Sequence, residues 1–124
     1  MSVISAYISQ VKKTIDKLPG VLSDELIIDN RGDVVLYLKG KIVFTNQSEL
    51  HLKEYFISVP EFKKIAYSYH YQGAEKELIF RYDNAEHHQE SENFPHHKHV
   101  GDKTFSAEEI SLDKILEIII DQMS

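Results

Sequence analysis

The stretch that decides the fold is KIAYSYHYQ at residues 64–72, followed closely by KELIFRYD at residues 76–83. Both segments alternate large apolar and polar residues, which is the period of a β-strand with one buried face, and Gly73 lies between them. If Gln72 faces Glu77, the alternation places these side chains on one apolar face: Tyr67, Tyr69, Tyr71, Leu78, Phe80 and Tyr82. We therefore predict an antiparallel hairpin with one buried and one polar face.

The polar face of this hairpin carries side chains that can do chemistry. The same register gathers His70, Ser68, Arg81 and Asp83 there, with Asp83 at the entry to the next loop. An Arg–Asp pair on a strand is also common as a solvated surface pair, which contributes little to stability. The pattern alone leaves both interpretations open.

Three further strands are expected before the hairpin. Residues 22–29, 33–44 (DVVLYLKGKIVF) and 49–58 (ELHLKEYFIS) are rich in β-branched and aromatic residues and are separated by short turn segments. Connections of this length favour neighbouring antiparallel strands. The sequence thus predicts an antiparallel sheet of about five strands.

Amphipathic helices are expected at both ends of the chain. Residues 4–18 have apolar side chains at helical spacing, with Ser2 as N-cap and a Pro-Gly pair after the last turn. Residues 112–123 show a second apolar stripe, with Ser106 or Ser111 as its cap. The fold class is therefore α+β, with an N-terminal and a C-terminal helix on one face of the sheet and the other face more open.

Composition excludes several classes of function. The chain has 124 residues and is expected to form a single domain, residues 1–124. It has no cysteine, which excludes disulfides, thiolate nucleophiles and cysteine-based zinc sites. Without an apolar run of about 18 residues or a leader pattern, we expect a cytoplasmic protein with no membrane partner. The net charge of −6 argues against attraction of the whole chain to nucleic acid, although residues 96–103 (HHKHVGDK) are locally positive.

Five of the seven histidines lie between residues 87 and 99, in a segment from 84 to 103 that we expect to be a long loop. One interpretation is a metal site. His97 and His99 form an H-x-H pair, to which His87 or His88 and Asp83 would be added to hold a divalent ion such as zinc. A solvated polar loop without a chemical role is a further interpretation.

The preferred interpretation uses imidazoles as acid–base groups, without a metal or other cofactor. One imidazole takes a proton from an RNA 2′-hydroxyl and another gives a proton to the leaving oxygen. We assign these roles to His97 and His99, with Arg81 as the phosphate clamp and Asp83 orienting a ring. His70 is a further candidate, because it shares the polar hairpin face with Arg81 and Asp83. Lys98 and Lys103 are expected to stabilise charge on the phosphate.

Glu54 is an acidic residue on an otherwise apolar strand face. It alternates with Leu50, Leu52 and Phe56, which predicts that its carboxyl group is desolvated. A carboxyl group in such a place suits general acid–base work, so Glu54 is also a candidate catalytic residue. A salt bridge to Lys41 or Lys53 is the alternative.

Four segments together resemble the TumE family of small prokaryotic toxins. They are EYF at 54–56, YSYHYQ at 67–72, LIFRYDNAEHH at 78–88 and FPHHKH at 94–99. The resemblance covers most of residues 50–120, and Glu86 stands where a proline is expected. It implies a toxin that acts on RNA and is paired with a small helix-turn-helix antitoxin protein.

Two hypotheses from different classes follow. The first is a toxin that is an endoribonuclease using histidine and arginine side chains in metal-independent acid–base chemistry, with a metal-dependent nuclease as its variant. The second is a non-catalytic metal-binding or antitoxin-binding regulatory module with a structural His-rich loop. The sequence leaves the oligomeric state open, a homodimer included.

Overall fold

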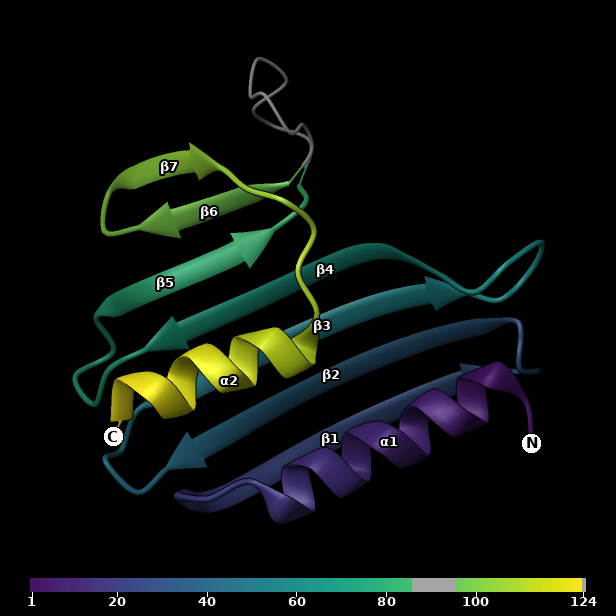
Figure 1. Cartoon of the computed structure of the whole chain (residues 1–124), viewed down its shortest axis with the longest axis horizontal. Helices are drawn as coiled ribbons and strands as arrows, with labels where there is room; N and C mark the ends of the chain where they lie inside the picture. The colour runs from purple at the N-terminus through teal and green to yellow at the C-terminus, as the bar shows by residue number, and fades with distance from the viewer. Residues whose placement is uncertain (86–95, 124) are drawn as a thin grey trace.

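The computed structural model describes residues 1–85 and 96–123 and has an α+β fold, as predicted (Figure 1). In chain order the elements are α1 (Val3–Lys17), β1 (Val21–Arg31), β2 (Val35–Phe44), β3 (Glu49–Ile57), β4 (Lys63–Gln72), β5 (Leu78–Asp83), β6 (His97–Val100), β7 (Lys103–Ser106) and α2 (Leu112–Met123). The strands form one antiparallel sheet in the order β1-β2-β3-β4-β5-β6-β7. The sheet therefore has seven strands where about five were expected.

Of the two additional strands, β6 lies in the segment 84–103 that we expected to be a loop, and β7 begins at the last residue of that segment, Lys103. Val100 pairs with Lys103, so β6 and β7 are joined by the two residues Gly101 and Asp102. Gly101 has a φ of 60°, which suits the first central position of a tight hairpin turn. The Gly-Asp pair was the sequence signal for this hairpin, and we missed it. The strands could not be recognised by their period alone, because strands of four residues show too little alternation.

Both helices cover the same face of the sheet (Figure 1). Helix α1 begins at the cap Ser2, whose Oγ accepts from the N–H of Ser5, and α2 begins after Ser111, which accepts from the N–H of Lys114. Ser111 rather than Ser106 is thus the cap of α2. The buried core between helices and sheet consists of Ile4, Val11, Ile15, Leu36, Leu38, Ile42, Phe44, Leu50, Leu52, Phe56, Tyr67, Tyr69, Tyr71, Phe80, Leu112, Ile115, Leu116 and Ile119. Neither described helix is long and apolar enough to cross a membrane.

The β4–β5 hairpin has a different register from the one predicted. Tyr71 pairs with Phe80 rather than with Leu78, and a bulge follows between Tyr71 and Gln72. Because the shift before the bulge is two residues, each side chain there stays on its predicted face. The tyrosines of β4 therefore enter the core, and Arg81 and Asp83 lie on the opposite face.

Candidate functional site

The sheet face that neither helix covers is called the open face. The pairing of β2 through β6 places alternate residues of each strand on it. His70, Arg81 and His99 are directly opposite one another on β4, β5 and β6, and Ser68, Asp83 and His97 form the adjacent row. Further along the same face lie Tyr37, Lys39, Lys41, His51, Lys53 and Tyr55.

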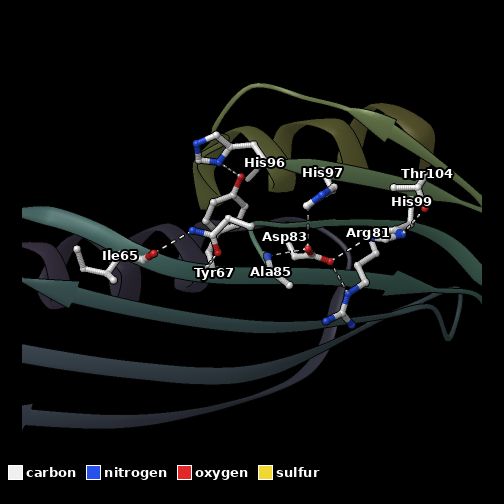
Figure 2. Close-up of polar contacts among 10 residues, drawn as sticks. Ile65, Tyr67, Arg81, Asp83, Ala85, His96, His97, His99 and Thr104 are labelled. Carbon is white, nitrogen blue, oxygen red and sulfur yellow. Dashed lines mark hydrogen bonds and ion pairs between the residues drawn. The ribbon is translucent and has the colours of Figure 1, made fainter. Parts of the chain in front are cut away.

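Asp83 is the centre of the polar contacts on this face (Figure 2). Its Oδ2 accepts a hydrogen bond from Nε of Arg81 at 2.9 Å and lies 3.1 Å from Nε2 of His99. Its Oδ1 accepts from the backbone N–H of Ala85 at 3.1 Å and lies 3.6 Å from Nδ1 of His97. Both carboxylate oxygens are therefore surrounded by donors.

These contacts keep Asp83 ionised although the residue is only 3% exposed. Burial alone would raise the pKa of its carboxyl group. The hydrogen bonds from Arg81 and from the Ala85 N–H, together with the charge interactions with His99 and Arg81, outweigh burial, and the pKa is lowered. Asp83 is thus a fixed negative charge that orients a guanidinium and two imidazole rings.

His70 contacts the other side of the same guanidinium. Nη1 of Arg81 is 3.4 Å from Nδ1 of His70, and Nε2 of His70 is 3.1 Å from Oε1 of Gln72. An Nε2–H that donates to the amide oxygen leaves Nδ1 with a lone pair, which matches a neutral ring. Burial, and then the charge of Arg81, lower the pKa of His70. Near pH 7 this imidazole is a base.

The two histidines of β6 differ in their access to solvent. The side chain of His99 is 18% exposed, and its Nδ1 lies 3.2 Å from Oγ1 of the exposed Thr104. The side chain of His97 is 0% exposed. On the open face, His99 is therefore accessible from solvent, whereas His97 is not.

Glu54 is buried, as its strand pattern predicted, but its side chain lies on the helix-covered face, opposite to the face that carries the Asp83 cluster. Its Oε1 accepts from the hydroxyl of Tyr7 at 2.5 Å, and its Oε2 accepts from the hydroxyl of Tyr69. Nζ of Lys64 donates to the Tyr69 hydroxyl at 2.8 Å and to the carbonyl oxygen of Ile110. This network joins α1, the sheet and the segment before α2, and its geometry is that of a structural group.

Sequence neighbours in the His-rich segment are divided between the two faces. Nδ1 of His96 is 2.9 Å from the hydroxyl of Tyr67, a core side chain, so His96 lies on the helix side. Nζ of Lys98 lies 5.4 Å from the ring centroid of Tyr82, also away from the open face. The expected phosphate contact of Lys98 is therefore not favoured by its position. His87 and His88 lie outside the described residues.

The candidate metal ligands were Asp83, His87, His97 and His99. Within residues 1–85 and 96–123, no three or more His, Asp or Glu side chains are arranged to hold a metal ion together. The described donors are Asp83, His97 and His99, and the first already accepts from Arg81. The metal hypothesis would need His87, which is outside the described residues.

Open-face residues of β2 and β3 were missed as candidates. Tyr37 and Tyr55 stack with ring centroids 4.7 Å apart and an interplanar angle of 11°. Lys39 and Lys53 are exposed and directly opposite each other, each two residues from the tyrosine of its own strand. Their positions could have been found from the sequence, because they alternate with core residues of the same strands.

Together, the fold and the site define a small α+β protein whose uncovered sheet face combines exposed lysines with an aspartate–arginine–histidine cluster. The family model described as Toxin TumE matches residues 11–123, and the chain belongs to this family of toxins. The match confirms the resemblance seen in the sequence, supports a toxin role and implies an antitoxin partner. No curated protein and no solved structure matches the chain.

Proposed function

We propose that this toxin is a metal-independent endoribonuclease whose site is the row His70, Arg81 and His99, with Asp83 beside it. The observation that carries the proposal is that Arg81 is paired with His70 on one side and His99 on the other, on a sheet face that neither helix covers. A phosphodiester bound to the guanidinium would have a histidine on each side. Cleavage of RNA by its own 2′-hydroxyl needs such a pair of acid–base groups around a stabilised phosphate.

In the proposed reaction, the phosphate of the RNA lies over Arg81. His70 accepts the proton of the neighbouring 2′-hydroxyl, and the 2′-oxygen forms a bond to phosphorus. The bond from phosphorus to the 5′-oxygen breaks as that oxygen takes a proton from the imidazolium of His99. The products are a 2′,3′-cyclic phosphate and a 5′-hydroxyl, and proton transfer between the two rings through water restores the starting state.

Each assignment has a physical reason in the site. His70 is the base because burial and Arg81 lower its pKa, which keeps its ring neutral. His99 is the acid because the Asp83 carboxylate, 3.1 Å from Nε2, orients the ring and leaves Nδ1 toward the exposed Thr104. The geometry favours this pair over our sequence-based choice of His97 and His99, because His97 is fully buried. His97 is instead a positioning residue for Asp83.

The direct test is cleavage of an unstructured RNA by the purified protein in the presence of a chelator. We expect 2′,3′-cyclic phosphate and 5′-hydroxyl ends, and a loss of about 100-fold or more in His99→Ala, the usual size of one acid–base contribution. His96→Ala is the matched control, since this histidine belongs to the same motif but contacts Tyr67 on the helix side. Its rate should be close to wild type.

The opposite chemistry has a clear signature. If chelation stops cleavage, added divalent metal restores it and the ends are 5′-phosphate and 3′-hydroxyl, the reaction uses metal-activated water. Asp83, His97 and His99 would then be ligands, and the acid–base proposal would be wrong. No cleavage of any RNA by a folded, growth-inhibiting protein would favour the non-catalytic binding module.

We also propose that the antitoxin partner is a helix-turn-helix protein. The support is the resemblance of the four segments at residues 54–56, 67–72, 78–88 and 94–99, together with the family match. Co-purification of the chain with the product of the neighbouring gene tests this. Recovery of a partner without a helix-turn-helix would overturn the assignment of its type.

A further inference from the structure

A hollow of about 770 Å³ on the open face connects the tyrosine pair to the Asp83 cluster. Its lining includes Tyr55 and Lys53 on one side, and Arg81 and Asp83 on the other. Between them the floor carries the small side chains of Ala66 and Ser68 on β4, and Ala85 lines the hollow beyond the end of β5. A space of this kind beside a flat ring is suited to another flat ring.

The tyrosines are arranged as an unfinished stack. Arg31 lies over Tyr37, with its Cζ 5.2 Å from the ring centroid, and Tyr37 stacks on Tyr55. The residue opposite Tyr55 on the next strand is Ala66, whose methyl group cannot continue the stack. The side of Tyr55 that faces β4 therefore borders the hollow.

The charges around the hollow suit a phosphodiester chain. Lys39 and Lys53 line it and are exposed, and neither forms an ion pair with another of the described residues. Of the acidic residues in the lining, Asp29 pairs with Arg31 at 3.0 Å and Asp83 pairs with Arg81. The carboxylate of Glu54 is held by the hydroxyls of Tyr7 and Tyr69 on the helix side. An anionic ligand thus meets a net positive surface in a chain whose formal charge is −6.

The side of the hollow next to Tyr55 lies on the same face as the phosphate that Arg81 would hold, a few nucleotides along an RNA chain from it. Lys53, Ser68 and Asp83 are directly opposite one another on β3, β4 and β5, and Tyr55 is one two-residue step from Lys53. Strand spacing and rise put the Tyr55 backbone about 10 Å across the sheet and about 14 Å along it from the backbone of Arg81, which is two residues beyond Asp83 on β5. A short run of single-stranded nucleotides can span that separation.

We propose that Tyr55 and Ala66 form a slot for one unpaired base of a single-stranded RNA, with Lys39 and Lys53 binding the flanking phosphates. This inference rests on the proposed function, whose substrate class it narrows from RNA in general to single strands. A base in the slot continues the Arg31–Tyr37–Tyr55 stack. A paired base cannot enter, because it would have to leave its duplex, and base stacking on aromatic rings is tolerant of sequence.

The test is a binding titration that does not depend on cleavage. The probe is a fluorescent, unstructured RNA of about eight nucleotides, a length within the range of single-strand sites. Every 2′-hydroxyl is methylated so that the nucleophile is absent. The full chain should bind this probe more tightly than it binds the corresponding duplex or adenosine monophosphate.

Two variants address the slot in opposite ways. Tyr55→Leu removes the ring and should weaken binding roughly 10-fold or more, the usual size of a lost base–aromatic stack, while Tyr55→Phe retains it. Ala66→Leu keeps the ring but fills the exposed space beside it, and should weaken binding similarly. Phe105→Leu is the matched control, because Phe105 is an exposed aromatic residue that lies on the helix side of the edge strand β7, away from the slot.

The outcomes separate this inference from the proposed function. If Tyr55→Leu and Ala66→Leu bind the probe like wild type while the wild type cleaves unmodified RNA, the slot is wrong and the nuclease stands. Equal affinity for adenosine monophosphate and the RNA probe would overturn the RNA slot in favour of a site for a free nucleotide. Equal affinity for the duplex and the single-stranded probe would overturn the single-strand requirement. No binding of the probe by a folded wild-type chain would overturn the slot, and cleavage would then be judged by its own assay.

Discussion

Tyr69→Phe should destabilise the protein without affecting cleavage. The residue is fully buried, and the substitution keeps the ring, so no cavity is formed. What is lost is a hydroxyl that donates to the Glu54 carboxylate and accepts from Nζ of Lys64. A hydrogen bond to a charged group contributes about 1.5 to 3 kcal/mol, and buried partners left unsatisfied add to the cost. We expect a loss of about 3 kcal/mol in the free energy of unfolding.

The matched control is Tyr71→Phe, on the same strand and the same face. The hydroxyl of Tyr71 donates to Oγ of Ser48 at 2.8 Å, so its partner is neutral. The expected loss is about 1 kcal/mol. Urea unfolding followed by circular dichroism measures the free energy of unfolding of both variants. For a chain of this length, the difference between them corresponds to a Tm of Tyr69→Phe that is roughly 5 to 10 °C below that of Tyr71→Phe.

Two results would refute this reasoning. Equal stabilities of Tyr69→Phe and Tyr71→Phe would mean that the carboxylate network contributes no more than a neutral hydrogen bond. A large loss of RNA cleavage in folded Tyr69→Phe, or in folded Glu54→Gln, would place Glu54 in the active site after all. Both variants should instead cleave at nearly the wild-type rate, since they alter the helix-covered face.

Three further predictions concern pH and growth. Cleavage should follow a bell-shaped pH profile. Its acid limb should lie below the ordinary histidine pKa of 6.5, because His70 must be neutral and its pKa is lowered by burial and by the charge of Arg81. In Arg81→Ala that charge is gone, so the acid limb of the residual activity should move to higher pH. The free energy of unfolding should decline as the pH rises above 10. Burial and Glu54 raise the pKa values of Tyr7 and Tyr69 in the folded state, so the unfolded chain releases these protons first. Tyr69→Phe lacks one of the two hydroxyls, so its free energy of unfolding should decline less over that range. Expression of the chain alone should slow bacterial growth and co-expression of its antitoxin should restore it, whereas normal growth with abundant folded protein and no partner would argue against a toxin.

Local patterns were sufficient for much of the fold. The apolar period and the Ser2 cap predicted α1, and alternation in residues 64–83 placed the tyrosines in the core and Arg81 with Asp83 on the other face. The faces were right although the pairing was shifted by two residues, because alternation has a period of two and does not specify register. Two strands were missed because each has only four residues.

The sequence by itself determined which side chains share a face within each strand, since this follows from the pleat and needs no partner. Only the tertiary structure decided which of those faces meet. Pairing of β6 with β5 brings His97 and His99 to Asp83, whereas His96, their neighbour in sequence, contacts the core side. Glu54 was rightly expected to be buried, but only the packing of α1 on the sheet shows that its carboxylate accepts hydrogen bonds from Tyr7 and Tyr69. Contacts between strands and helices far apart in sequence depend on packing of the whole chain, which no local period encodes.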